Sequence, residues 1–193
     1  MVTVRKTGAR DAERLPDIER SAARAFLALP DLAWIAGDDV QPAERHRELI
    51  AGGHAWVAVD SDDAPVGFLA AEKLDDTLHV WELAVRHDWQ RRGIGRALLA
   101  RAVEAARAEG LAAVTLTTFR DVAWNEPFYR RFGFRILAAD AVPRHLKKVL
   151  EAEAAHGLPP GRRCAMALTL AGRRMDAVRR RIASGPQTAF SGA

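Results

Sequence analysis

The stretch Leu78–Leu99, LHVWELAVRHDWQRRGIGRALL, decides the fold. Its first part, Leu78–Val85, is apolar and predicts a strand, and its last residues open a helix with apolar residues at helical spacing. Between them lies the loop Gln90–Gly95, in which two glycines let a ligand approach unpaired amides at the positive end of the helix dipole. Three arginines add charge around this loop: Arg91, Arg92 and Arg96. The stretch therefore predicts a site for a pyrophosphate.

Two other phosphate-binding loops and an ordinary turn compete with this interpretation. A P-loop ends in Gly-Lys-Ser/Thr, which the sequence lacks here. A dinucleotide-binding loop places its glycines directly after the strand, with a third small residue three positions beyond the second glycine. Here the residues from Arg86 to Arg92 separate the strand from Gly93, and Leu98 stands at the third place. A left-handed turn before an ordinary helix stays an alternative.

A second motif, Asn125–Phe134 (NEPFYRRFGF), follows further along the chain. Together with the Gln-x-x-Gly-x-Gly loop and the Leu-Ala-Val strand before it, this motif resembles the GNAT superfamily of N-acetyltransferases, over roughly residues 2–170. The resemblance implies a single α/β domain whose mixed central β-sheet is flanked by helices and splayed between the fourth and fifth strands. It also implies acetyl-CoA as cosubstrate, with coenzyme contacts at Leu83, Ala84, Val85, Gln90, Arg91, Arg92, Gly93, Ile94, Gly95, Arg96, Asn125 and Phe128.

Length and composition predict one domain. The chain has 193 residues, of which 49% are hydrophobic, enough for a substantial core. We expect residues 2–170 to form the acetyltransferase domain, with a helical insertion at 140–160, and residues 171–193 to form a basic, flexible tail. The single Cys164 cannot form an internal disulfide, and we find neither a signal segment nor an apolar run long enough to span a membrane. A cytoplasmic protein without a membrane partner is the expectation.

The basic charge gathers at the C-terminal end. Residues 171–193 carry five arginines and one aspartate, an excess of +4 that equals the formal net charge of the whole chain. The rest is therefore neutral overall, which argues against a nucleic-acid-binding core. A protein that binds nucleic acid through the tail stays an alternative, and its binding would weaken steeply with added salt.

Alternation and apolar spacing predict the remaining elements. The expected strands are 2–6, 56–60, 66–74, 78–85, 112–119, 134–137 and 163–170, and the expected helices are 11–29, 42–51, 96–110, 122–132 and 143–156. The last of these helices, in the insertion, either lids the acceptor site or covers a sheet edge, and we favour edge cover. By the family resemblance, the first two helices wall the acceptor site. Phe26, Trp34 and Ile35 there are either substrate contacts or core residues.

Two side chains of the central strand, His79 and Glu82, are candidates for a general base. An alkylammonium, with a pKa near ~10, is scarcely nucleophilic at neutral pH until a base or a water chain removes a proton. Alternation places His79, Trp81, Leu83 and Val85 on one side of the strand and Glu82 on the other, unless a bulge intervenes. By the resemblance, histone acetyltransferases of the family carry a glutamate base at the position of His79, arylalkylamine acetyltransferases carry a histidine there, and many other members carry an acid at the position of Glu82. A strand histidine bonded to a neighbour, and an ion-paired glutamate, are the structural alternatives.

Tyr129, the only tyrosine, matches the general acid of the family, which protonates the departing thiolate; a buried aromatic role is its alternative. Asn125 either caps the helix that it opens or bonds the coenzyme. By the same resemblance, backbone amides near Leu83–Val85 hold the oxyanion. The reaction requires no metal, and the six histidines show no ligand spacing. A ping-pong route through Cys164 is less favoured than direct transfer.

These observations predict an N-acetyltransferase that moves an acetyl group from acetyl-CoA to a primary amine of a small molecule or peptide, in a ternary complex. A non-catalytic sensor that binds acyl-CoA is the alternative, since the coenzyme motifs serve both. We expect no nucleic-acid partner, and a homodimer by analogy alone. The acceptor stays open because its walls come from the first helices and the insertion rather than from the motifs.

Overall fold

The computed structural model describes residues 2–170, and the expected tail at 171–193 lies outside this range. Within it, seven strands form one sheet in the order β1-β2-β3-β4-β5-β7-β6. The strands are β1 (Thr3–Lys6), β2 (Ala55–Val59), β3 (Pro65–Leu74), β4 (Thr77–Val85), β5 (Ala113–Phe119), β6 (Arg135–Ile136) and β7 (Arg163–Thr169). The helices are α1 (Leu15–Ala23), α2 (Ala43–Ala51), α3 (Ile94–Ala108), α4 (Glu126–Phe132) and α5 (Arg144–Ala155).

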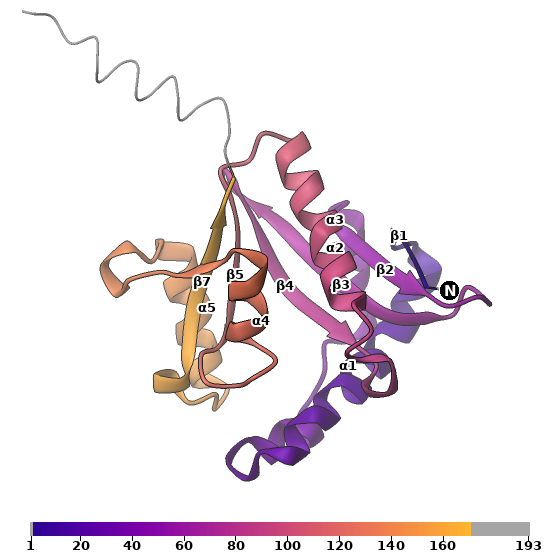
Figure 1. Ribbon diagram of the computed structural model, residues 1–193, viewed down its shortest axis with the longest axis horizontal. Helices are drawn as coiled ribbons and strands as arrows, with labels where there is room; N and C mark the ends of the chain where they lie inside the picture. Colours follow the sequence, from indigo (N-terminus) through magenta and orange to yellow (C-terminus); the bar gives the residue numbers. More distant parts are fainter. Residues whose placement is uncertain (1, 171–193) are drawn as a thin grey trace, which may run out of the picture.

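The sheet parts between β4 and β5. These strands run parallel and pair only through Thr77 with Ala113, Leu78 with Val114, and His79 with Thr115. Beyond this point β4 pairs with β3 alone and β5 with β7 alone, both antiparallel, so the two halves diverge in a V (Figure 1). The expected mixed α/β sheet, split between its fourth and fifth strands, is therefore confirmed.

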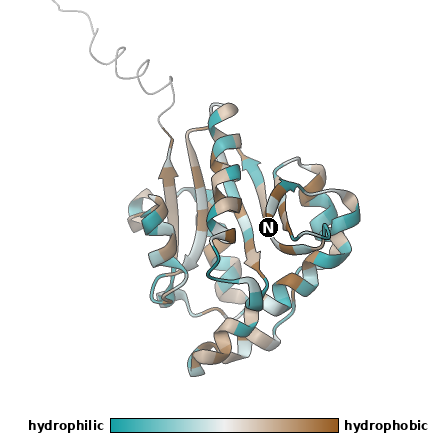
Figure 2. Cartoon of the chain, turned by 45° about the vertical axis from the view of Figure 1, so that its right-hand side comes forward, coloured by the Kyte–Doolittle hydropathy of each residue, from teal (hydrophilic) through white to brown (hydrophobic). Residues whose placement is uncertain are grey.

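Apolar layers cover both faces of the sheet. One side of α3 packs on the first face, where Leu98, Leu99 and Ala102 are buried among the inward side chains of β3, β4 and β5. Leu15 and Ile18 of α1 cover the opposite face against Phe68. Figure 2 shows brown segments along the strands and alternating brown and teal along α3, as expected for a helix with one buried side.

A β-bulge in β4 changes which side chains share a face. Glu82 pairs with Ala70 of β3, and Val80 pairs with the next residue, Ala71, so Trp81 is an extra residue in the ladder. Leu83 and Val85 therefore pack on the α3 face, whereas Glu82 and His79 share the opposite face. The expected alternation, with His79 beside Leu83 and Val85, is wrong because the bulge reverses it.

The first expected helix, 11–29, is broken into short segments. A 3₁₀ helix at Ala9–Arg14 precedes α1, and two more follow at Arg24–Ala28 and Pro30–Gly37. Pro16 fixes the start of α1, since proline is tolerated in the first turn, where its missing N–H has no helical partner. Pro127 likewise starts α4 at Glu126, later than the expected residue 122. Other boundaries shift by one or two residues, the usual scatter at element ends.

The insertion covers a sheet face, so the expectation of edge cover is wrong. Helix α5 packs on β5 and β7, and β6 forms the edge of the sheet on that side. The Glu153 carboxylate of α5 accepts hydrogen bonds from the Thr117 hydroxyl and from the Arg163 guanidinium. At the end of α5, His156 Nε2 lies 2.8 Å from Asp38 Oδ2. The insertion thus contacts the chain just after the 3₁₀ helix Pro30–Gly37.

Candidate active site

The glycine loop presents free backbone amides. Gly93 stands at the N-cap of α3 with a left-handed φ of 81°, and Arg91 is also left-handed, with a φ of 63°. The first helical hydrogen bond runs from Ala97 N to Gly93 O, at 3.0 Å, so the amides of the preceding turn have no acceptor within the helix. A Cβ added at Gly93 would meet no atom within 4 Å, so the site is open as well as strained. Such a turn suits an anion.

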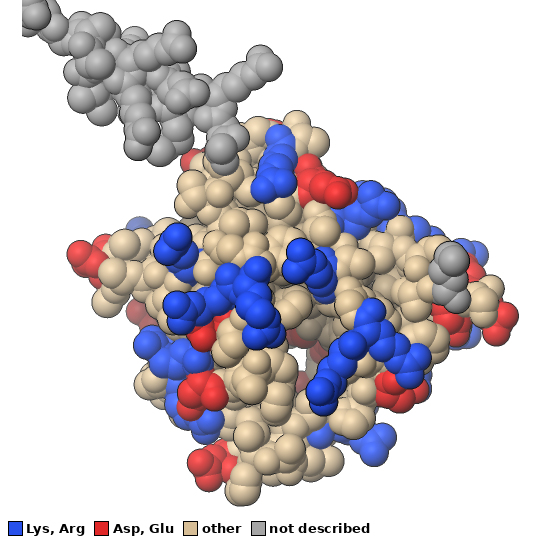
Figure 3. Space-filling model, viewed as in Figure 1, with Lys and Arg blue, Asp and Glu red and all other residues tan. Residues whose placement is uncertain are grey.

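Side chains brace this loop against β4 and α4. Gln90 Nε2 donates to the Val85 carbonyl at 3.0 Å, which ties the loop to the end of β4. The Arg92 guanidinium lies 4.9 Å from the Trp89 ring centroid, and a Cβ added at Gly95 would come within 3.7 Å of Phe128. Lys and Arg side chains gather over α4 and the start of α3 around a central hollow (Figure 3). The predicted coenzyme residues of both motifs therefore lie together.

Asn125 opens α4 without capping it. Its backbone carbonyl accepts hydrogen bonds from Phe128 N at 2.9 Å and Tyr129 N at 3.1 Å, but its side chain makes no cap bond. Of the two alternatives for Asn125, capping by its side chain is therefore excluded, and a bond to the coenzyme stays a prediction. Its backbone, with φ −104° and ψ −101°, turns the residue away from the usual N-cap geometry. Within residues 2–170 its carboxamide forms no hydrogen bond and is available to a ligand.

Tyr129 is a protonated phenol in an aromatic layer. Its half-buried ring lies 5.0 Å from the Phe128 centroid and 5.8 Å from that of Phe134. Burial raises the pKa of the Tyr129 phenol well above its usual range, and the negative charge of Glu82 raises it further, while Arg163 lowers it. The phenol therefore keeps its proton at neutral pH and has one to donate.

Glu82 lies on β4, in the half of the sheet opposite to the one that carries Tyr129. The side chain is half-buried, and loss of hydration raises the pKa of Glu82 to about 8, with the charge of Glu19 as the second cause. The Leu83 amide and Arg163 pull the pKa of Glu82 in the opposite direction. A carboxylate that titrates this close to neutral pH is suited to accept and release protons.

His79 lies at the point of the V, where β4 and β5 last pair. The residue is 1% exposed, its Nδ1 is 3.1 Å from Thr115 Oγ1, and its ring meets the Trp81 ring edge-on at 4.5 Å. Burial, with a smaller contribution from His145, lowers the pKa of His79 to about 4. The structure thus shows a neutral strand histidine bonded to a neighbour.

Two backbone amides of β4, those of Leu83 and Val85, point into the gap between β4 and β5. Arg86 N donates to Val66 O of β3 at 2.9 Å. Because successive backbone amides of a strand alternate in direction, those of Leu83 and Val85 point the other way, and the amide of Ala84 points to β3. Since β5 pairs with β4 only as far as His79, no strand receives these two amides. They are placed to bind an oxygen atom that enters the gap.

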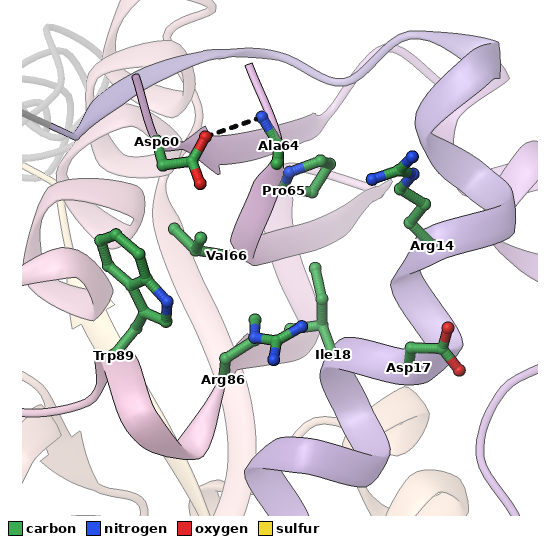
Figure 4. A pocket seen from close by; sticks show the side chains of 9 residues that line it. All are labelled: Arg14, Asp17, Ile18, Asp60, Ala64, Pro65, Val66, Arg86 and Trp89. Atoms are coloured by element: carbon green, nitrogen blue, oxygen red, sulfur yellow. Dashed lines mark hydrogen bonds between the residues drawn. The ribbon is translucent and has the colours of Figure 1, made fainter. Parts of the chain in front are cut away.

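A separate cavity of about 370 Å³ opens beside the loop. Its lining residues come from the start of α1, the β2–β3 turn and the end of β4 (Figure 4): Arg14, Asp17, Ile18, Asp60, Ala64, Pro65, Val66, Arg86 and Trp89. None of the predicted catalytic side chains lines it.

Among residues 2–170, no cluster of three or more His, Cys, Asp or Glu residues is arranged to hold a metal. No helix in that range has the length and apolarity to cross a membrane.

Sequence reasoning missed two charged residues that act on Glu82. Glu19 of α1 is 9% exposed, and Arg163 starts β7. One signal was present in the sequence: Glu19 lies four residues after Leu15, on the same helical stripe as Ile18, where a core residue is expected. A charged residue on an apolar stripe marks a buried group. Arg163 carries no comparable local signal.

A mixed sheet that parts beside a glycine loop at a helix start defines an α/β protein whose loop is suited to an anionic group. The sequence profile described as "Acetyltransferase (GNAT) family" matches residues 18–134. The chain belongs to this family.

Solved structures show the same fold. The PaiA N-acetyltransferase of Thermoplasma acidophilum, in complex with coenzyme A, superposes with a TM-score of 0.65 at 17% identity, over 88% of this chain and 99% of that one. The ribosomal-protein-S18-alanine N-acetyltransferase of Escherichia coli gives 0.62 at 18% identity, over 90% and 97%. N-acetylglutamate synthase of Neisseria gonorrhoeae, complexed with coenzyme A and N-acetyl-glutamate, gives 0.62 at 18% identity, over 88% and 35%. At these identities the likeness concerns the fold.

Proposed function

We propose that the protein transfers the acetyl group of acetyl-CoA to a primary amine of a small molecule or peptide, by direct attack in a ternary complex. The single observation that carries the proposal is the placement of Glu82 on β4 and Tyr129 on α4, in the two halves of the parted sheet. Burial and the charge of Glu19 raise the pKa of the Glu82 carboxyl to about 8, and burial and the charge of Glu82 raise the pKa of the Tyr129 phenol, which keeps its proton. A base and an acid on two sides of one gap are what amine acetylation requires.

The glycine loop would hold the coenzyme. The amides around Gly93, Ile94 and Gly95 face an open, strained turn, and the surrounding arginines supply positive charge for the pyrophosphate. The rest of the coenzyme would enter the gap between β4 and β5. There the amides of Leu83 and Val85 would bind the thioester oxygen, which becomes the oxyanion when the amine attacks. Asn125 and Phe128 would border the coenzyme from α4.

The chemistry follows from these positions. Glu82 takes a proton from the bound ammonium, and the free amine nitrogen then attacks the thioester carbon. The C–S bond breaks as the new C–N bond is completed, and Tyr129 gives its proton to the departing thiolate. The nitrogen then releases its second proton to solvent, and the Tyr129 phenolate takes a proton back from solvent. Each proton-transfer group supplies roughly 10²- to 10⁴-fold in rate in known enzymes. His79 is less suited to the base role, because it is buried and its Nδ1 already contacts Thr115.

The test is release of free thiol from acetyl-CoA, measured across a panel of amines, amino acids and peptides. We expect amine-dependent release by the natural chain, and a loss of about 100-fold in Tyr129→Phe with coenzyme affinity unchanged. Calorimetric titration with coenzyme A measures that affinity separately. Tight coenzyme binding without any amine-dependent release would instead favour an acyl-CoA sensor. Unchanged turnover in Tyr129→Phe would remove the tyrosine from the mechanism.

A further inference from the structure

The cavity of about 370 Å³ between the start of α1, the β2–β3 turn and the end of β4 contains charged groups that acetyl transfer does not use (Figure 4). Arg14 and Arg86 both line it, and neither belongs to the glycine loop or to the gap between β4 and β5. Its volume lies at the lower end of the range for small-molecule sites. The cavity is therefore large enough for a small organic ligand.

The two guanidinium groups of this cavity have few negative partners. Within residues 2–170 Arg14 has no carboxylate partner, whereas Arg20, further along α1, is paired with Asp17 at 2.7 Å. That pairing also neutralises Asp17, the acid that α1 brings to the cavity. Arg86 meets only the exposed Asp88, with 3.4 Å between Nε and Oδ1. Both arginines therefore have hydrogen-bond donors to offer to an anion.

The opposite wall offers an aromatic ring and one carboxylate oxygen. Figure 4 shows Trp89 and Asp60 across the cavity from Arg14. Asp60 Oδ1 accepts hydrogen bonds from the amides of Asp62 and Ala64, both at 3.0 Å, which fixes the β2–β3 turn. Asp60 Oδ2 accepts no hydrogen bond from the part of the chain that the structure describes. This second oxygen is therefore an acceptor for a donor group of a ligand.

The surface between these walls is apolar. Ile18 and Val66, which are 1% and 3% exposed, line the cavity between the arginines and Trp89. A flat apolar body would pack on these side chains and on the indole ring. Guanidinium groups bind carboxylates with paired, charge-assisted hydrogen bonds. The walls together match a ligand with a carboxylate at one end, a flat ring in the middle and a hydrogen-bond donor at the other end.

We propose that this cavity is a second binding site, for a small aromatic carboxylate that carries a hydrogen-bond donor at the far end of its ring. The carboxylate lies against Arg14 and Arg86, the ring packs beside Trp89, and the donor faces Asp60. The inference goes beyond the proposed function, because such a ligand needs no amine and touches none of the predicted catalytic side chains.

Titration of the full chain with 4-hydroxybenzoate tests the proposal, because this probe has the carboxylate, the ring and the donor but no amine to be acetylated. Calorimetry measures the affinity, and NMR follows the indole N–H of Trp89, assigned by its loss in Trp89→Phe. We expect saturable binding that shifts this resonance. Benzoate should bind about threefold more weakly because it lacks the donor, and phenol at least about tenfold more weakly because it lacks the charge. Equal affinity for the three probes, or for sulfate, would overturn the proposal.

Two variants remove the charges that hold the carboxylate. Arg14→Gln and Arg86→Gln should each weaken the binding of 4-hydroxybenzoate about tenfold. Arg14 is exposed and Arg86 half-buried, so neither change removes a core side chain. Arg101→Gln is the matched control, since its side chain on α3 is 54% exposed and paired with Glu104, and its affinity should stay within about twofold. Natural affinity in Arg14→Gln and Arg86→Gln would contradict the assignment.

Ala64→Leu fills the cavity without changing a charge, and its backbone amide is still available to Asp60. We expect at least about a tenfold loss of affinity, because the larger side chain occupies the space of the ring. Saturating coenzyme A should leave the affinity for 4-hydroxybenzoate within about threefold, whereas displacement by coenzyme A would place the probe at the glycine loop and overturn the proposal. None of these measurements uses turnover, so a failure of the proposed acetyl transfer leaves their outcome readable.

Discussion

The two faces of the parted sheet offer different chemical groups to a ligand. Around the start of α3, the features offered to a ligand are backbone amides and exposed guanidinium groups on a strained loop. On the face under α1, they are the side chains of Glu19, His46, His79 and Glu82, which are buried or half-buried. Changes on the first face should therefore weaken coenzyme binding, and changes on the second should alter rate and pH dependence.

The sharpest test of this contrast is Glu82→Gln. We expect kcat/KM to fall about 10³-fold, because the base is lost, while affinity for coenzyme A stays within about twofold. The folded-state pKa of Glu82, about 8, lies above its ordinary 4.5, so the stability that its protonated form contributes is lost as pH rises from 4.5 through 8. The variant should therefore be more stable than the natural chain by about 2 kcal/mol at pH 9, and equally stable at pH 4.

Urea unfolding at the two pH values measures this difference. Glu48→Gln is the control, since its side chain is 66% exposed. A tenfold loss of coenzyme affinity in Glu82→Gln would contradict the separation of the two faces.

His79→Gln tests the buried face through stability alone. The folded-state pKa of His79, about 4, lies below its ordinary 6.5, so its contribution is complete above pH 6.5 and is lost as pH falls through 4. Glutamine keeps a hydrogen-bonding group for Thr115 but does not titrate. Between pH 7 and pH 4.5, the natural chain should lose about 2 kcal/mol more stability than the variant in urea unfolding. Parallel losses in the two proteins would show that His79 is not a buried neutral imidazole.

Gly93→Ala tests the coenzyme face. The φ of 81° disfavours any side chain by roughly 1 kcal/mol, so the loop should shift and coenzyme A should bind about tenfold more weakly, with kcat little changed. Gly110→Ala carries a similar backbone cost, with φ 68°, beyond the far end of α3. Equal losses of affinity in the two variants would indicate general destabilisation rather than a loop that binds the coenzyme.

The smallest expected effect belongs to Arg91→Asn. Asparagine tolerates the left-handed backbone at this position, so the substitution removes the charge with little strain. We expect coenzyme affinity to fall about threefold at low salt, and the difference to shrink in 0.5 M salt because exposed charges are screened. Arg101→Gln, on the outer side of α3 and paired with Glu104, should leave affinity unchanged. A salt-independent loss would point to loop distortion instead of charge.

The sequence predicted the loop and helix at Gly93 better than the face under α1, for a physical reason. The turn at Gly93 and the helix after it depend on neighbouring residues, so spacing alone located them. The bulge at Trp81 leaves no mark in the alternation of β4, since it arises from pairing with Ala70 and Ala71 of another strand. Glu19 and His46 belong to different helices, and only tertiary packing brings them together. Edge cover is the sequence expectation for the insertion because the sequence does not reveal that Glu153 reaches Thr117.

Because the sheet parts at β4, hydrogen exchange of the β4 amides should report whether a ligand occupies the gap between β4 and β5. In heavy water, the amide of Arg86, bonded to β3, should exchange slowly with the core of the sheet. The amides of Leu83 and Val85 point into the gap and should exchange early, although they belong to the same strand. A carbonyl seated in the gap would slow these two alone. Neighbouring residues of one strand would then differ in their rates of hydrogen–deuterium exchange, and this difference would report whether the gap is filled.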